Sequence, residues 1–249
     1  MDPKPASSNR PLPILTAYYD SEAERRGFVR RLFDTTAGDY DRVERLLSFG
    51  TGARYRRQAL LRGGLKPGMR VLDVAIGTGL VAREALAVLA AHGCVVGLDP
   101  SAGMLREARA GGATALVQGV GERLPFAEGQ FDFISIGYAL RHVSDLGSVF
   151  REFRRVLRPG GIACVLEIAR PDNALSRGAL KLYLRGIAPV LSRIVGRTPE
   201  APALYRYFWD TIEACVPPVQ IIDALREAGF EDVGRHVEAR MFSEYTARR

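Results

Sequence analysis

Two acidic residues and a short glycine loop are the part of this 249-residue sequence best suited to bind a ligand. Asp73 lies within an apolar run, and Gly77-Thr78-Gly79 follows it, directly before a helical pattern. Glycines let a backbone approach a ligand closely, and the free N–H groups at the start of a helix favour an anionic group. Asp99 ends the next apolar run, 20 residues beyond Gly79, where a carboxylate can accept hydrogen bonds from both hydroxyls of a ribose. The pattern therefore indicates a site for a nucleoside-containing cofactor.

The glycine loop fits two cofactor classes, and Asp73 distinguishes them. With Ala82, the loop satisfies the G-x-G-x-x-A pattern of dinucleotide sites, and the position of Asp99 fits that class too. A carboxylate inside the run Val-Leu-Asp-Val, however, is costly to desolvate unless a cation pairs with it. The α-ammonium of S-adenosylmethionine would supply that cation, directly or through water, whereas a dinucleotide has none there. The sequence favours S-adenosylmethionine, and the alternative is that Asp73 only braces the turn.

These residues require a scaffold that gathers the ends of several strands. Continuous apolar runs that alternate with helical patterns are typical of a parallel sheet covered on both faces, which binds ligands at the carboxyl ends of its strands. We predict strands at 70–75, 94–98, 115–118, 131–136, 162–168, 232–239 and 241–247. We predict intervening helices at 79–91, 101–110, 147–157 and 219–228.

Further segments surround this core within what we interpret as a single domain of residues 1–249. Residues 1–19 are predicted to be a disordered lead-in, and 20–64 to form N-terminal helices. Residues 173–216 are predicted to be a helical lid inserted over the active-site edge, with a break or kink at Pro189, which cannot continue a helix regularly.

Composition narrows the classes of function. No apolar run reaches the roughly 18 residues of a membrane span, and no apolar signal-peptide core is present, so we expect a cytoplasmic protein. The three cysteines are far apart, which indicates buried thiols, and no metal site is expected. The net charge of +7 comes from scattered arginines, so it does not by itself predict a nucleic-acid or membrane partner.

Several segments resemble the ubiquinone/menaquinone biosynthesis C-methyltransferases. Residues 155–161 (Arg-Val-Leu-Arg-Pro-Gly-Gly) and 165–171 (Val-Leu-Glu-Ile-Ala-Arg-Pro) are similar to that family's second signature, with Ala169 where serine is usual. Residues 39–41 and 47–50 resemble its first signature. The resemblance covers about residues 28–245. It implies a class I, Rossmann-like S-adenosylmethionine-dependent methyltransferase: a doubly wound α/β fold with a seven-stranded, mostly parallel sheet and an antiparallel last strand.

The resemblance also implies which residues hold the cofactor. Thr78 and the backbone of Gly77–Gly79 would face the methionine part, with Asp73 behind it. The rest of the cofactor would meet Asp99 at the ribose, Met104 on the adenine, Val120 and Gly121 at the adenine edge, Gly137 after the fourth strand, and Tyr40 closing over it from the N-terminal helices. Met104 is apolar and lies on a predicted helix, so it is equally well explained as a residue of the hydrophobic core.

The chain departs from the family pattern mainly on the substrate side. Val120-Gly121 replaces Asp-Ala, which removes the acid that would accept from the adenine amino group. In the first signature, Glu44 stands for Asn, Gly52 for His and Tyr55 for Trp. After the fourth strand, the usual Arg-Asn becomes Arg141-His142.

Methyl transfer from a sulfonium is an in-line displacement, so positioning supplies most of the catalysis. For a hydroquinone ring, removal of a hydroxyl proton raises electron density at the attacked carbon. Arg141 is a candidate to stabilise the phenolate, directly or through water, and the ordinary pKa of His142 suits a general base. The alternatives are that Arg141 pairs with Asp145 or Glu152 and that His142 is a surface residue.

We therefore predict an S-adenosylmethionine-dependent methyltransferase acting on a small aromatic molecule, with C-methylation of a quinol ring favoured. The alternative is O- or N-methylation of a soluble secondary metabolite. The run after the fourth strand, Gly137-Tyr-Ala-Leu, lacks the Asn/Asp-Pro-Pro-Tyr/Phe pattern of nucleic-acid amino-methylases, so no nucleic-acid partner is expected. The sequence leaves the oligomeric state open, with a homodimer as one alternative.

Residues 174–197 combine apolar side chains with a basic set, which suits either a helix lying on an anionic membrane or an ordinary lid with solvated arginines. Peripheral contact with the inner membrane is therefore a second alternative for location. The basic residues are Arg177, Lys181, Arg185, Arg193 and Arg197.

Overall fold

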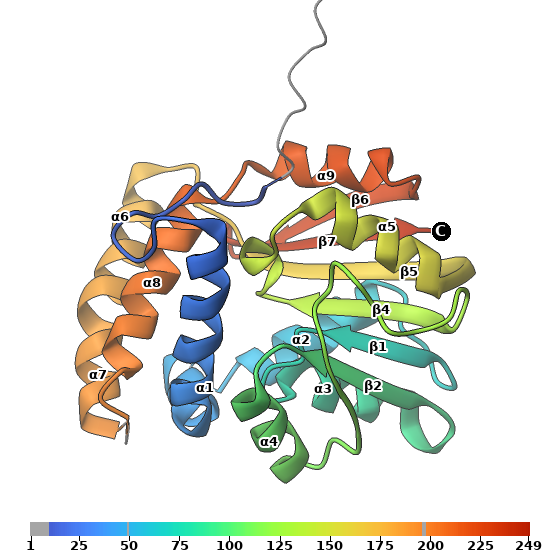
Figure 1. Ribbon diagram of the computed structural model, residues 1–249, viewed down its shortest axis with the longest axis horizontal. Coiled ribbons are helices and arrows are strands. Elements are labelled where there is room, and N and C mark those ends of the chain that lie inside the picture. The colour runs from blue at the N-terminus through green and yellow to red at the C-terminus, as the bar shows by residue number, and fades with distance from the viewer. Residues whose placement is uncertain (1–9, 49, 196–197) are drawn as a thin grey trace, which may run out of the picture.

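Seven strands form one sheet in the order β3-β2-β1-β4-β5-β7-β6 (Figure 1) in the computed structural model, which describes residues 10–48, 50–195 and 198–249. Every neighbouring pair is parallel except those of β7, which is antiparallel to β5 and to β6. The predicted fold class is thus confirmed. The strands are β1 (Arg70–Val74), β2 (Cys94–Asp99), β3 (Ala115–Gln118), β4 (Phe131–Gly137), β5 (Leu157–Ile168), β6 (Glu231–Glu238) and β7 (Phe242–Arg248).

The central strands are apolar on both faces because helices cover both sides of the sheet. On one face, α5 (Leu146–Val156) and α9 (Pro218–Glu227) pack on β1, β4 and β5. On the other, α2 (Gly52–Arg62) and α3 (Leu80–Leu89), which continues into the turn η1 (Ala90–His92), pack on the same strands, and α4 (Ala102–Ala110) extends this layer toward β2 and β3. This is the doubly wound arrangement that the continuous apolar runs predicted.

The helix α5 illustrates how local sequence determines an element. The Asp145 side chain accepts a hydrogen bond at 2.6 Å from the backbone N–H of Ser148, which caps the helix start. The buried residues Leu146, Val149, Phe150, Phe153 and Val156 recur at helical spacing and face the sheet.

A second helical layer stands beside the carboxyl ends of the strands (Figure 1). It consists of α1 (Glu22–Leu47), α6 (Ala174–Leu182), a π-helical stretch η3 (Tyr183–Ile187), α7 (Ala188–Val195) and α8 (Ala201–Ala214). Pro189 is the second residue of α7, which continues from the π-helical stretch without a gap, so the helix has an irregularity before Pro189 but is not broken into two pieces there. Proline lacks an N–H and its ring collides with the carbonyl four residues earlier, which favours a local irregularity before it.

The prediction of a disordered lead-in is wrong for residues 10–19. The Tyr18 hydroxyl donates to Asp210 of α8 at 2.6 Å, and the Val216 N–H donates to the Pro11 carbonyl at 3.0 Å. Leu12 and Tyr19 are buried. The apolar residues scattered among the prolines thus fasten this segment to α8, while residues 1–9 lie outside the described part of the chain. Within the described part, no helix is both long and apolar enough to cross a membrane.

Candidate functional site

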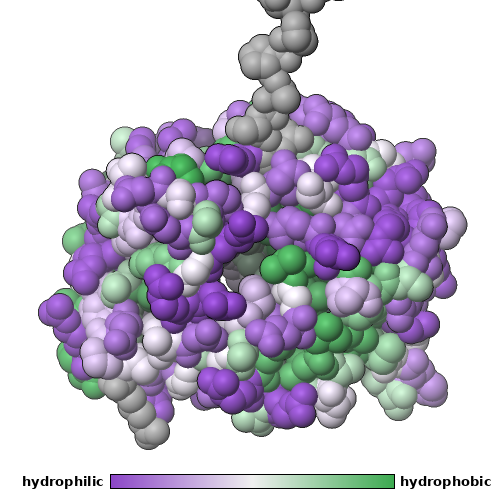
Figure 2. Space-filling view, in the orientation of Figure 1, coloured by the Kyte–Doolittle hydropathy of each residue, from purple (hydrophilic) through white to green (hydrophobic). Residues whose placement is uncertain are grey.

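A cavity of about 1370 Å³ opens between the carboxyl ends of the strands and the second helical layer. Figure 2 shows a hollow near the middle of this face. Ligand pockets commonly measure about 300–1,000 Å³, so this one has room for a cofactor and a second molecule side by side. Its walls come from the loop after β1, the ends of β2 and β4, and the helices α1, α6 and α8.

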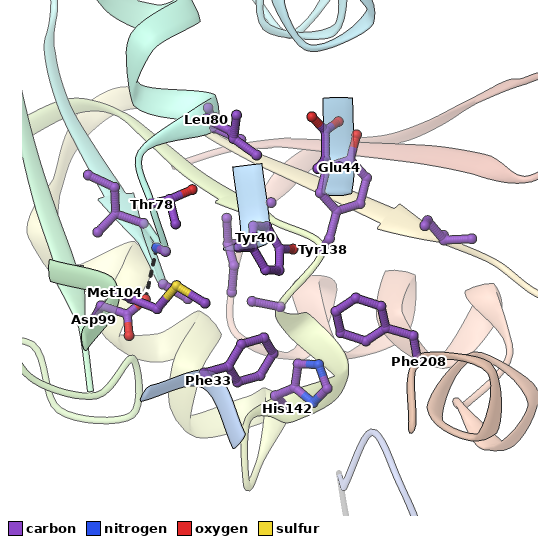
Figure 3. A pocket seen from close by; sticks show the side chains of 18 of the residues that line it. Phe33, Tyr40, Glu44, Thr78, Leu80, Asp99, Met104, Tyr138, His142 and Phe208 are labelled. Carbon is purple, nitrogen blue, oxygen red and sulfur yellow. Dashed lines mark hydrogen bonds between the residues drawn. The ribbon is translucent and has the colours of Figure 1, made fainter. Parts of the chain in front are cut away.

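The glycine loop adopts backbone conformations that glycine makes accessible. Gly77 has φ of 57° and Gly79 has φ of 89°, and Gly79 directly precedes α3. The Gly77 N–H donates to Asp99 Oδ2 at 2.9 Å (Figure 3). The loop and Asp99, which the sequence analysis placed in one site, are therefore joined by a hydrogen bond.

Asp99 is buried at the end of β2 and lines the cavity. Its Oδ1 accepts from the Ser101 N–H at 2.8 Å. Burial raises its pKa to about 6, although the backbone N–H groups of Ser101 and Gly77 favour the charged form. Two oxygens fixed by backbone donors can still accept from ligand hydroxyls, because each carboxylate oxygen accepts more than one hydrogen bond.

Asp73 lies behind the loop rather than in the cavity wall. It faces Ser135 across the β1–β4 pair, and its Oδ1 accepts from the Ser135 hydroxyl at 2.7 Å. Its Oδ2 is buried and has no donor in hydrogen-bonding geometry among the described residues, although the nearby backbone N–H of Ala82 favours the charged carboxylate. Burial raises the pKa of Asp73 to about 7. An ionisable oxygen left without a donor suits a ligand that brings a cationic group to this side of the loop.

The other residues predicted to bind the cofactor surround the same cavity, apart from Gly79. The lining residues among them are Tyr40, Gly77, Thr78, Asp99, Met104, Val120, Gly121 and Gly137. The Thr78 hydroxyl donates to Asp41, so this side chain ties the loop to α1. At Gly137 a Cβ would approach Val81 Cγ2 to 2.6 Å, so only glycine fits beside α3 at the end of β4.

The structure places Arg141 behind the cavity wall, in the turn η2 (Leu140–His142). It forms a buried ion pair with Glu167, and its Nε donates to the Thr211 hydroxyl of α8 at 3.0 Å. Its guanidinium lies 5.5 Å from the ring centroid of Phe208. Direct contact with a substrate, one of the two routes suggested for Arg141, does not match this position.

The alternative partners suggested for Arg141 are also wrong. Asp145 caps α5, and Glu152 pairs with Arg155 at 2.7 Å. Arg141 instead reaches Glu167 because the end of β5 lies next to the end of β4 in the sheet.

His142 lines the cavity and carries two buried ring nitrogens without a partner among the described residues (Figure 3). Its ring stacks on Tyr207 at 5.6 Å between centroids and meets the edge of Phe33 at 5.5 Å. Burial lowers its pKa well below 6.5, and the charges of Arg141 and Arg25 lower it further. The imidazole is therefore neutral, and the suggestion of a surface residue is wrong.

Four residues of the cavity wall that Figure 3 displays were not predicted from the sequence: Phe33, Leu80, Tyr138 and Phe208. Glu44, which the sequence marked only as a departure from the family pattern, also lines the cavity. Phe208 belongs to a group of aromatic residues in α8 (Tyr205, Tyr207, Phe208 and Trp209), but the sequence does not show which of them line the cavity. Tyr138 directly follows the observed strand β4, which extends one residue beyond the predicted strand, and its backbone φ of 60° could not be predicted from the sequence. Non-glycine residues in this region are strained and concentrate at functional sites.

The sheet order, the antiparallel β7 and the loop and acid after β1 and β2 define the class I methyltransferase fold. A SAM-dependent methyltransferase from Aquifex aeolicus superposes with a TM-score of 0.59 at 18% identity, over 84% of this chain and 97% of that one. Phosphoethanolamine N-methyltransferase 2 from Haemonchus contortus, solved with S-adenosyl-L-methionine, gives 0.63 at 16% identity, over 90% and 60%.

The sequence comparisons are more specific. The profile of the ubiE/COQ5 methyltransferase family matches residues 19–240. The demethylmenaquinone methyltransferase of Roseiflexus castenholzii is 34% identical over 217 residues, covering 86% of this chain and 88% of the relative. The ubiquinone/menaquinone biosynthesis C-methyltransferase UbiE of Syntrophotalea carbinolica is 39% identical over 214 residues, covering 83% and 87%. The chain belongs to the ubiE/COQ5 methyltransferase family, and it is an S-adenosylmethionine-dependent methyltransferase, as the sequence predicted.

Proposed function

We propose that the protein methylates a ring carbon of a quinol, with the cofactor against the ends of β1 and β2 and the substrate under the second helical layer. The observation that carries the proposal is His142, a neutral imidazole without a partner among the described residues, which lines this large cavity between two aromatic rings. The names of the relatives, which refer to menaquinone and ubiquinone, agree with an aromatic substrate.

The residues present suit the cofactor at both of its ends. The unpartnered Oδ2 of Asp73, behind the Gly77 loop, fits an ammonium group that comes close directly or through water. Asp99 would accept from the ribose hydroxyls, and Met104, Val120 and Gly121 would enclose the adenine. Gly137 and Tyr40 would border the cofactor on the substrate side. When bound, S-adenosylmethionine supplies an electrophilic methyl group.

His142 would act on the substrate hydroxyl. A neutral imidazole nitrogen accepts the hydroxyl proton, and the ring oxygen then pushes electron density toward the ring carbon that forms the new bond. The protonated imidazole, a ready proton donor because its pKa is lowered, returns its proton to the ring oxygen while the methylated carbon releases its own proton to water, which restores the aromatic diol. Phe33 and Phe208 line the same part of the cavity and would hold a flat ring (Figure 3). Positioning of this kind supplies most of the rate enhancement in a displacement reaction.

Arg141 would be a positioning residue. It connects the turn that carries His142 to Glu167 of β5 and to Thr211 of α8, and it lies against Phe208. Arg25 of α1 supports the same turn, because its guanidinium donates to the His142 carbonyl at 2.8 Å. Contacts with β5, α8 and α1 thus hold the turn that carries the imidazole.

An assay under reducing, oxygen-free conditions tests the proposal. A naphthoquinol with a free ring position is incubated with the cofactor, and the product is examined by mass spectrometry and NMR. A new ring-methyl signal with loss of one ring proton supports C-methylation. An O-methyl or N-methyl product, or turnover only of soluble phenols and amines, would favour the methylation of a secondary metabolite instead.

We also propose that the lid contacts an anionic lipid surface. Its inner side contributes Leu180 and Leu184 to the cavity wall, whereas its outer side is apolar and exposed. The exposed residues are Leu175, Leu182, Ile187, Val190 and Ile194. Lys181 and Arg193 are exposed beside them, and this mixture suits a helix in a membrane interface. A prenylated substrate could then enter with its tail still in the bilayer.

The paired arginines of the lid contribute less to this surface. Arg177 pairs with Glu213, and Arg185 pairs with Asp210 at 2.7 Å. Arg197, which the sequence analysis included in the basic set, lies outside the described residues.

A further inference from the structure

An ion pair lines the cavity, one turn of α1 beyond Asp41, which holds Thr78 of the glycine loop. Arg56 of α2 donates to Glu44 of α1 at 2.9 Å, and both residues line the cavity. The Arg56 side chain is 5% exposed and that of Glu44 is 24% exposed. A pair this enclosed costs desolvation energy that its mutual attraction only partly returns. Its stabilising effect on the fold is therefore a weak reason for its presence.

The chain leaves space for this pair at Gly52. A Cβ at Gly52 would overlap Glu44 Oε1 and would lie 3.1 Å from Arg56 Nη2. A side chain at the first position of α2 would make the flexible ends of Glu44 and Arg56 shift, so glycine at this position leaves the pair its space.

Hydrogen-bonding capacity remains unused around the pair. Arg56 Nε is buried and has no acceptor among the described residues. Only Oε1 of Glu44 accepts from Arg56, which leaves the second oxygen able to accept. Tyr138 also lines the cavity, and the charges of Arg56 and Glu44 act on its phenol. In Figure 3, Tyr138 and Glu44 lie on the opposite side of Tyr40 from Asp99 and Met104.

The position of Tyr138 is fixed independently. Its backbone has φ of 60°, and its N–H donates to the Leu166 carbonyl at 2.7 Å. It follows Gly137, whose contact with Val81 fits α3 closely against the end of β4. Tyr138 packs against the core cluster formed by α2, α3 and the sheet, and it also lines the cavity, where the charges of Arg56 and Glu44 act on its phenol.

We propose that Glu44, Arg56 and Tyr138 form a subsite that binds an uncharged hydroxyl of the substrate, and that they select a ring with two hydroxyls over a ring with one. The carboxylate and the guanidinium cancel in charge, so the subsite favours a neutral group over an ion. It offers both donors and an acceptor, and a hydroxyl uses both. His142 faces the reacting hydroxyl, and the second hydroxyl lies at the subsite. The inference rests on the proposed function only in placing the substrate in this part of the cavity.

Binding of two matched probes tests the subsite without any methyl transfer. The probes are 1,4-dihydroxynaphthalene and 1-naphthol, which differ by one hydroxyl, titrated by anaerobic calorimetry into protein saturated with S-adenosylhomocysteine. We expect the diol to bind about tenfold more tightly, as a charge-assisted hydrogen bond gives. Tyr138→Phe and Glu44→Gln should each lower this ratio about three- to tenfold while the affinity for 1-naphthol stays within about twofold.

Control variants distinguish a specific loss of the subsite from general damage to the fold. Glu84→Gln makes the same change in a glutamate that pairs with Arg57 of α2 at 2.8 Å outside the cavity lining, and it should leave the ratio unchanged. Gly52→Ala should lower the ratio as Glu44→Gln does. The subsite would be contradicted if the wild-type protein bound the two probes with equal affinity or did not bind the diol. It would also be contradicted if the variants lost affinity for both probes equally. Absence of methylated diol alone would count against the proposed function only.

Discussion

The guanidinium of Arg141 and the carboxylate of Glu167 form an ion pair in which each side chain is only 2% exposed. The pair joins the turn after β4 to the end of β5, and the bond from Arg141 to Thr211 extends it to α8. The second helical layer is thus anchored to the sheet through one arginine next to His142.

Arg141→Ala should lower both stability and turnover. Removing one partner of a buried pair leaves a buried charge unpaired, which costs about 3–5 kcal/mol in the free energy of unfolding. Urea denaturation measures this loss, and calorimetry should show that cofactor affinity changes far less than turnover. Arg151→Ala is the control, because this side chain is 64% exposed and lies 3.9 Å from Asp145. Unchanged stability with a selective loss of turnover would instead indicate that Arg141 acts on the substrate itself.

Asp99→Ala should weaken binding of S-adenosylmethionine. Losing a charge-assisted hydrogen bond to the ribose costs about 1.5–3 kcal/mol, or roughly 10- to 150-fold in Kd. Calorimetry provides the measurement, and Asp223→Asn, in an exposed acid of α9, should bind like the wild type. Tight binding of NAD without any response to the sulfonium cofactor would contradict the assignment of this site.

The stability of the ligand-free protein should fall as pH rises from about 4 toward neutrality, because of Asp73. Its pKa is about 7 in the folded protein against an ordinary value of 3.8, so folding favours the protonated form. Stability from this source is complete below pH 4 and is lost as pH rises to about 7. Between pH 5 and 7.5 the loss should be roughly 2–3 kcal/mol, because each pKa unit corresponds to about 1.4 kcal/mol.

Asp73→Asn isolates this effect. The variant should lose less stability than the wild type over the same pH interval, as chemical denaturation at several pH values would show. Cofactor binding, which brings an ammonium group, should stabilise the wild type more at pH 8 than at pH 5. Identical pH profiles for the variant and the wild type would show that the carboxyl does not titrate in this range.

His142→Gln should reduce kcat by about 10²–10⁴-fold, the usual contribution of a general base. Cofactor affinity should stay within about twofold, and His236→Gln, an exposed histidine of β6, should leave kcat unchanged. Burial and two arginines depress the pKa of His142 well below 6.5, so the imidazole is neutral at neutral pH. With saturating cofactor, any fall in kcat due to this group should therefore be centred well below pH 6.5. A fall centred near pH 6.5 that disappears in the variant would contradict the depressed pKa.

Sedimentation with vesicles tests the lipid contact. The protein should bind vesicles that contain an anionic lipid, and binding should decrease with salt because the attraction is partly electrostatic. Lys181→Glu with Arg193→Glu should weaken it, whereas Arg226→Glu, on the exposed side of α9, should have little effect. If the protein stayed in the supernatant at low salt, the proposed contact with a lipid surface would be contradicted.

The fold and the cofactor class could be predicted from sequence because they depend on local patterns. Apolar runs revealed β1 to β5, and the loop at Gly77 with Asp99 followed from spacing. The environment of His142 could not be predicted, because Phe33 and Tyr207 reach it from helices far apart in the chain. The same holds for Arg141, whose partner Glu167 becomes a neighbour only when β4 and β5 align.

The segment 10–19 has a practical consequence for anyone preparing this protein. Its composition invites trimming together with the residues before it, yet Tyr18 packs edge-on against Tyr207 at 5.1 Å, and Tyr207 stacks on His142. A truncation beginning at residue 20 would therefore remove a support only two aromatic contacts away from the imidazole. If the shortened protein were inactive, the loss of activity would reflect a disturbed aromatic stack around His142. It would not show that the wrong substrate had been chosen for the assay.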